Sequence, residues 1–180
     1  SFCIRIPIIL KFGDISLDNE WGIILKNFIN FEKFSLRQFD GFYLPNIQMP
    51  PLYAFYLYLI YIIQAGKDIV YHESSFFITS VLFSHAILAS ISVAVFFIIC
   101  RNFFSERLSI FCALIFSIFP VHVFACSQIS SVSLQLFLTI LFIYIFLKIT
   151  KNPNFLNIFY FSLISALLLL LRGEFFILFF

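Results

Sequence analysis

The chain has 180 residues, of which 62% are hydrophobic and only 11% are charged, and its mean hydropathy is +1.06. A soluble globular domain is about half apolar and about a quarter charged. This chain cannot cover itself with a charged surface, so its composition predicts an integral membrane protein. The formal net charge of +2 is too small to indicate a nucleic-acid partner.

The cysteines and histidines show no metal-ligand spacing. The four cysteines are Cys3, Cys100, Cys112 and Cys126, and no two of them form a C-x-x-C pair. We therefore expect small buried hydrophobic side chains, with neither a disulfide framework nor a metal site.

The first 74 residues divide into a short apolar stretch and a polar segment. Residues 1–12 are expected to be the end of a first span, and residues 13–74, which hold most of the acidic side chains, an outer loop. Because the chain begins at Ser1 and stops inside an apolar run, we interpret it as the N-terminal part of a longer protein.

Two helices are expected within the outer loop. Trp21, Ile24, Leu25 and Phe28 follow i, i+3, i+4, i+7 spacing, which predicts an amphipathic helix lying in the membrane interface. Ser16 or Asp18 is the expected N-cap, and Asp40-Gly41 further along predicts a turn. The tyrosine-rich run at 52–66 predicts a second interfacial or half-inserted helix, with a true span as the alternative.

Four further spans are expected at about 75–100, 108–126, 131–149 and 155–180. The basic joints at 101–107 and 148–154 are assigned to the cytoplasmic side by the positive-inside rule, so the first loop faces out. The expected fold is all-α: one domain formed by a polytopic transmembrane helix bundle with interfacial juxtamembrane helices in the first outer loop.

Candidate chemistry gathers outside the spans, which are expected to hold almost no ionisable residues and hence no proton or ion path. Asp18 is the first candidate, either as a general base or merely as a helix cap. Arg172 suits a phosphate, but it could instead pair with Glu174 or snorkel. Glu20, Tyr53 and His122 are further candidates to line a site, whereas His85 is expected to be a hydrogen-bonded core residue.

Four stretches together resemble the polytopic C-type glycosyltransferases, and most closely the dolichyl-phosphate-mannose protein mannosyltransferase and aminoarabinose transferase superfamily. The stretches are an acidic motif heading a helix, a Pro-Pro-Leu-Tyr segment, two spans with a basic joint and an outer proline, and a basic break in the last span. They read SLDNEWGIILKNFINFEKFS, NIQMPPLYAFYLYLIY, FFIICRNFFSERLSIFCALIFSIFP and LLLLLRGEFFILFF.

The resemblance implies an inverting enzyme that passes a sugar from a polyprenyl-phosphate donor to an acceptor. It assigns the catalytic base to Asp18 and the donor-phosphate contact to Arg172. It also implies a multi-pass protein of the bacterial inner membrane, in contact with membrane lipid, whose active site faces out and which can use a divalent metal. The sequence departs from the family pattern at Asn19, where a Glu often follows the Asp, and at Met49, where related enzymes carry a Lys.

Two alternatives stay open at this point. One is a polymerase or ligase of surface polysaccharide, and the other is a non-enzymatic transporter or scaffold. A transporter predicts functional polar residues or broken spans near the bilayer midplane. The stretch in hand is expected to be inactive by itself.

Overall fold

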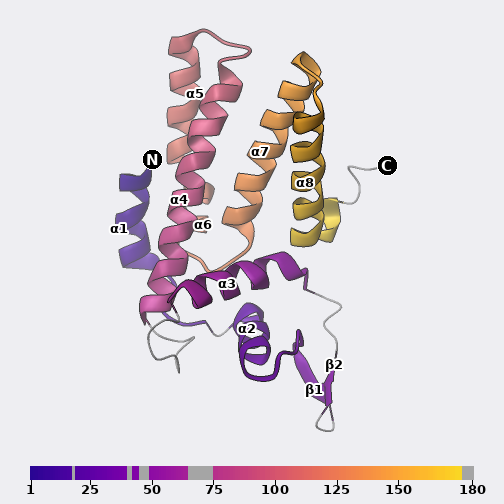
Figure 1. Cartoon of the computed structure of the whole chain (residues 1–180). Helices are drawn as coiled ribbons and strands as arrows, with labels where there is room; N and C mark the ends of the chain where they lie inside the picture. Colours follow the sequence, from indigo (N-terminus) through magenta and orange to yellow (C-terminus); the bar gives the residue numbers. More distant parts are fainter. Residues whose placement is uncertain (18, 40–41, 45–48, 65–74, 176–180) are drawn as a thin grey trace. The chain divides into compact units, whose positions relative to one another are not determined.

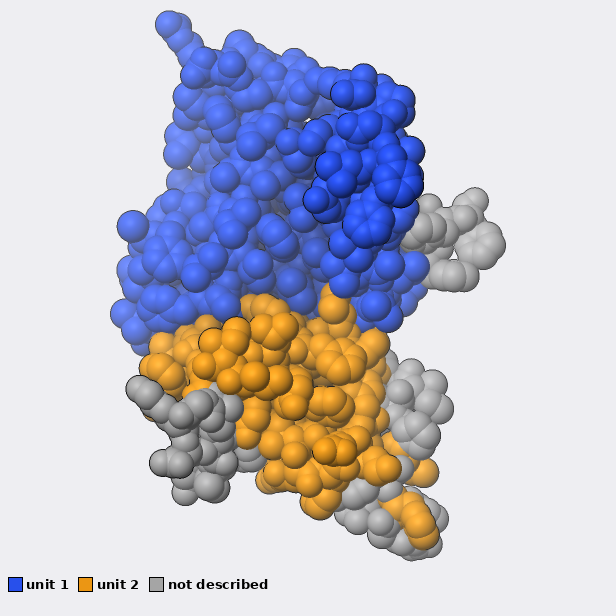
Figure 2. Space-filling model, viewed as in Figure 1, with its two compact units in different colours: residues 1–13, 82–180 blue, residues 14–81 orange. Residues whose placement is uncertain are grey.

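The computed structural model describes residues 1–17, 19–39, 42–44, 49–64 and 75–175. These residues are almost entirely helical, which confirms the expected helical class (Figure 1). The chain divides into two compact units (Figure 2): unit 1 comprises residues 1–13 and 82–180, and unit 2 comprises residues 14–81.

Unit 1 is a set of helices, and short connections join those from α4 to α8. Helix α7 packs along α8, with the rings of Phe142 and Phe161 4.8 Å apart, and the short helix α6 packs against α1, α5 and α7. The elements are α1 (Phe2–Phe12), α4 (Ser75–Cys100, whose first turns belong to unit 2), α5 (Glu106–Ile118), α6 (Pro120–Ala125), α7 (Val132–Lys151) and α8 (Phe155–Leu171).

Two helices among the described residues are long and apolar enough to cross a membrane, namely α4 with 26 residues and α7 with 20. They match the spans expected at 75–100 and 131–149. Helix α8 is shorter, with 17 residues, and it ends where Arg172 takes an extended conformation. The span expected to run from 155 to 180 therefore stops at Leu171, and residues 176–180 lie outside the described part.

The single span expected at 108–126 is wrong, because two helices occupy this stretch. Helix α5 ends at Ile118, Phe119 takes a non-helical ψ of 120°, and Pro120 begins α6. Proline has no N–H to donate to the preceding turn, and its ring clashes with the carbonyl four residues back. The chain therefore breaks at Phe119, and one would-be span becomes a pair of short helices.

Unit 2 contains α2 (Glu20–Phe31), β1 (Arg37–Phe39), β2 (Phe42–Leu44) and α3 (Pro51–Gln64). The amphipathic pattern of α2 is confirmed, since Ile24 and Leu25 are fully buried. The expected caps Ser16 and Asp18 are corrected: Asn19 is the N-cap, and its Oδ1 accepts a hydrogen bond of 3.2 Å from the Gly22 N–H. An Asn side chain reaches this donor as readily as Ser or Asp does.

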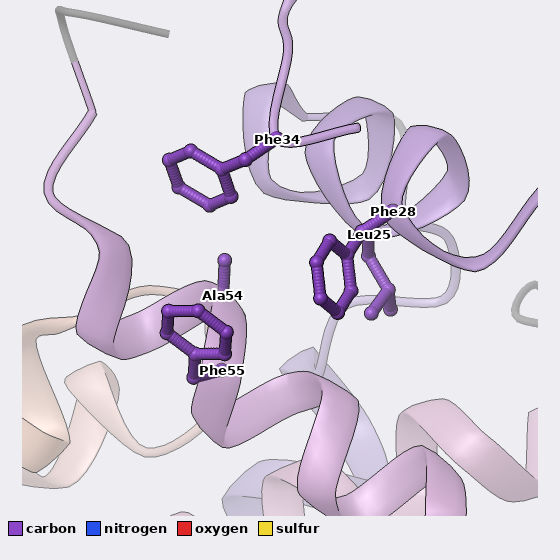
Figure 3. A pocket seen from close by; sticks show the side chains of 5 residues that line it. All are labelled: Leu25, Phe28, Phe34, Ala54 and Phe55. Atoms are coloured by element: carbon purple, nitrogen blue, oxygen red, sulfur yellow. The ribbon is translucent and has the colours of Figure 1, made fainter. Parts of the chain in front are cut away.

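Aromatic rings join α2 to α3. Phe28 meets Tyr58 edge-on at 4.8 Å and Phe55 at 5.8 Å, while Phe34 stacks on Phe55 at 6.2 Å. Figure 3 shows these phenylalanines facing an apolar hollow that Leu25 and Ala54 complete. The hollow has no room for water, so it belongs to the packing between the two helices.

A small hairpin, which the sequence analysis did not anticipate, follows α2. Strands β1 and β2 pair antiparallel, with Arg37 opposite Leu44 and Phe39 opposite Phe42. The turn expected at Asp40-Gly41 lies outside the described residues, between these strands. The hairpin is tied to α2 because Asn27 Nδ2 donates to the Ser35 carbonyl at 2.8 Å and Ser35 Oγ donates to the Leu44 carbonyl.

Candidate functional site

The most unusual group in unit 1 is a buried arginine on α1. Arg5 is 0% exposed, and its Nη1 donates to the Ser1 carbonyl at 3.1 Å and to the Ser1 hydroxyl. Its Nε and Nη2 make no hydrogen bond with an oxygen or nitrogen atom of the described residues, and the Cys126 thiol is a weak polar neighbour of the guanidinium. A buried charge costs several kcal/mol unless it is paired, so a guanidinium with these neutral neighbours is a candidate to bind an anion.

Besides Ser1, Arg5 has two polar neighbours, on helix α6 and at its C-cap. Arg5 acts electrostatically on the His122 imidazole and on the Cys126 thiol. The His122 imidazole contacts two aromatic rings: its centroid lies 4.8 Å from that of Phe116 and 5.1 Å from that of Phe119. Because the chain breaks at Phe119, α6 follows a different course from α5. This change of direction places His122 near Arg5.

Hydrogen bonds fix the rest of this polar cluster. Cys126 Sγ donates to the His122 carbonyl at 3.2 Å, and Ser133 Oγ donates to the Ala125 carbonyl at 3.2 Å. The fully buried His85 on α4 makes a hydrogen bond with the backbone of Gln128. His85 is thus a hydrogen-bonded core residue as expected, and it anchors the connection between α6 and α7.

This arrangement suits an oxyanion. A guanidinium presents donors in a planar fork that matches phosphate and carboxylate, and Nε with Nη2 forms one such bidentate edge. Nη1 is already oriented by Ser1, which holds the fork in one direction. The site therefore has the chemistry to bind a phosphate or carboxylate within an apolar helix bundle.

Arg5 is the functional candidate that sequence reasoning missed. The available signal was its spacing, since Arg5 and Ile9 are one helical turn apart and form the buried face of α1. What the sequence does not reveal is the partner of that face. Helix α6 lies more than a hundred residues further along the chain.

The residues predicted in the outer loop belong to unit 2, and Asp18 itself lies outside the described residues. Glu20 is exposed at the first position of α2. Tyr53 is fully buried, and its ring meets Trp21 at 4.9 Å. Burial, then Tyr56 and Asp14, raise the pKa of Tyr53 well above its usual value of 10.0, so its hydroxyl is a neutral hydrogen-bonding group.

Arg172 sits at the C-terminal end of α8. Its Nη1 lies 3.7 Å from Glu174 Oε2, and 38% of its side chain is exposed. This matches the pairing that was the alternative to a phosphate contact. The structure thus brings His122 to Arg5 and Asp14 to Tyr53, and it sets Arg172 beside Glu174.

The described residues contain no group of three His, Cys, Asp or Glu side chains that could hold a metal ion. No family model, curated protein or solved structure matches the chain.

Proposed function

We propose that the protein is a polytopic membrane glycosyltransferase that moves a sugar from a polyprenyl-phosphate donor to an acceptor on the outer face of the membrane. Two helices of the described part are long and apolar enough to cross a bilayer, and the resemblance of the motifs supplies the reaction class. A surface-polysaccharide polymerase or ligase would use the same kind of lipid-linked substrate, so it is the related alternative.

The observation that carries the proposal is the fully buried Arg5, whose Nε and Nη2 make no hydrogen bond with an oxygen or nitrogen atom of the described residues. Ionisable residues inside apolar bundles are costly and mark sites of function. A lipid-linked sugar phosphate brings a diester anion into such a bundle together with an apolar tail. The donor would satisfy Nε and Nη2 of Arg5 and bury its tail among the surrounding apolar side chains.

In the proposed reaction an acceptor hydroxyl attacks the anomeric carbon. The bond from that carbon to the phosphate oxygen breaks, and its electron pair leaves with the lipid phosphate, whose growing negative charge Arg5 would stabilise. The acceptor proton passes to a carboxylate, a role for which the resemblance proposes Asp18. Arg172 remains proposed as a donor-phosphate contact.

A transporter of an organic anion is the second candidate. The helix break at Phe119–Pro120 and the cluster of Arg5 and His122 are the broken span and polar core that this reading predicts. Both candidates use Arg5 to bind an anion, but only the glycosyltransferase breaks a bond to the bound phosphate.

The test is transfer of labelled sugar from polyprenyl-phosphate donors by the whole protein in membranes. Wild type is compared with Asp18→Asn, Arg5→Gln and Arg172→Gln. Asn keeps much of the size of Asp but cannot act as a base, and we expect transfer to fall at least about a hundredfold. Transfer by Arg5→Gln should fall by a similar factor, because the substitution removes the guanidinium donors. A larger loss of transfer in Arg5→Gln than in Arg172→Gln would make Arg5 the principal phosphate contact.

The outcomes separate the candidates. Full transfer by Asp18→Asn would reject the assigned base, and full transfer by Arg5→Gln would reject the phosphate site. If wild type transfers no sugar from any donor but moves a labelled sugar phosphate into sealed vesicles, and Arg5→Gln does not, the protein is a transporter.

A further inference from the structure

A second polar hollow lies where α4 and α7 end. Residues from the last turns of the two helices line a cavity of about 320 Å³. Three are cationic (Arg101, Lys148, Lys151), three are neutral and polar (Asn102, Tyr144, Asn152), and two are apolar (Ile98, Leu147). No acidic side chain is among the described residues that line it.

The cations are held in place to different degrees. Arg101 pairs with Glu106 at 2.7 Å, and Lys151 Nζ donates to Asn102 Oδ1, which links the two helix ends. The Lys148 ammonium has neither an ion pair nor a hydrogen bond with any described residue. One acidic neighbour offsets one of three cations, so the hollow keeps a positive charge with Lys148 available to a ligand.

We propose that this hollow binds the phosphate of an anionic phospholipid headgroup. Basic pockets between the ends of membrane helices, on the side where positive residues gather, attract such headgroups. The lining fits an amphiphile: the cations and amides face a phosphate, while Ile98 and Leu147 flank the glycerol and the start of the acyl chains. Cytosolic inorganic phosphate shares the anionic chemistry but makes no use of the apolar flank.

This site is separate from the Arg5 cluster. Arg101 directly follows the end of α4 at Cys100, and the fifteen helical residues that separate Cys100 from His85 correspond to about 22 Å at about 1.5 Å per residue. The proposal therefore does not depend on the proposed sugar transfer. It predicts a structural or regulatory lipid bound at the opposite end of α4.

The test uses the whole protein in a zwitterionic detergent and counts bound lipids by native mass spectrometry during titration with phosphatidylglycerol. Lys148→Gln should weaken binding about fivefold, the effect of one cation near a charged headgroup. Lys148→Arg should restore it. Arg107→Gln is the matched control, because Arg107 is a cation in the first turn of α5, close in sequence to Arg101, that does not line the hollow.

Retention of phosphatidylglycerol over phosphatidylcholine, lost in Lys148→Gln and kept in Arg107→Gln, would support the site. Persistence of the bound lipid in millimolar inorganic phosphate would assign it to a lipid headgroup. Displacement there, with the same dependence on Lys148, would overturn the lipid assignment in favour of free phosphate. Equal weakening by the two Gln variants, or no preference for phosphatidylglycerol in wild type, would overturn the site.

Discussion

The two units differ in the kind of polar side chain that they bury. In unit 2 the buried Tyr53 carries its polarity on a neutral hydroxyl within an aromatic cluster, with Trp21 at 4.9 Å. In unit 1 the buried Arg5 keeps two nitrogen donors that make no hydrogen bond with an oxygen or nitrogen atom of the described residues. A phenol can stay neutral, but a guanidinium keeps its charge in proteins. Burial in unit 2 therefore serves packing, whereas burial in unit 1 points to a ligand.

Among substitutions that test this difference, we expect replacement of Arg5 to change stability and activity most. Arg5→Met replaces the guanidinium by an apolar side chain of similar length, and replacing a buried charge in this way is often neutral or stabilising by about 1–4 kcal/mol. We therefore expect a higher melting temperature in detergent together with loss of sugar transfer. A melting temperature several degrees lower would show that Arg5 stabilises the fold, and the contrast with unit 2 would fail.

The tight packing of unit 2 is tested at Gly22. A Cβ there would lie 1.9 Å from the Leu17 carbonyl oxygen, whereas a Cβ at Gly173 would meet nothing within 4 Å. Gly22→Ala should cost about 1–3 kcal/mol through overpacking, despite the usual gain from Ala in a helix. Gly173→Ala is the control and should leave chemical unfolding unchanged. Equal unfolding midpoints for the two variants would contradict close packing at α2.

The neutral state of Tyr53 makes a prediction about pH. Because its pKa is raised in the folded protein, the unfolded chain loses this proton first as the pH passes 10.0, and stability falls from there upward. The loss should be about 1 kcal/mol per pH unit in wild type and absent from this position in Tyr53→Phe. Unfolding midpoints at pH 9 and pH 11 measure it, with the exposed Tyr160→Phe as control. An unchanged slope in Tyr53→Phe would place the hydroxyl in water.

The smallest expected effects concern the two asparagine caps, one in each unit. Asn19 caps α2, and Asn154 caps α8 by accepting from the Asn157 N–H at 2.8 Å. Replacing either by Ala should cost about 1 kcal/mol. Hydrogen exchange should speed up in α2 alone for Asn19→Ala and in α8 alone for Asn154→Ala. Simultaneous loss of protection in both helices would mean that the units unfold together.

The sequence predicted those features that depend on local periodicity. The apolar stripe of α2 and the long apolar runs of α4 and α7 can be recognised from residues one or two helical turns apart. Pro120 is also a local signal for a helix break. The apolar run continues through it, however, and this continuity led to the prediction of a single span. The hairpin was missed because strands of three residues carry too little pattern.

The candidate site was harder to predict, for a physical reason. Arg5 looks like an interruption of an apolar run, and its importance depends on burial against α6, which no local pattern encodes. His122 was found because it follows Pro120. Asp18 and Arg172 were candidates by their chemistry, and the resemblance added their roles. Asp18 lies outside the described residues, and Arg172 pairs with Glu174.

We propose that Arg5 binds the phosphate of a polyprenyl lipid. The melting temperature of the whole protein, measured with and without polyprenyl phosphate, tests this binding most directly. Ligand at about a hundred times its dissociation constant stabilises the folded state by about 2.7 kcal/mol. We predict an upward shift in wild type and none in Arg5→Met, whose unliganded form melts higher. An equal shift in the two proteins would contradict the claim.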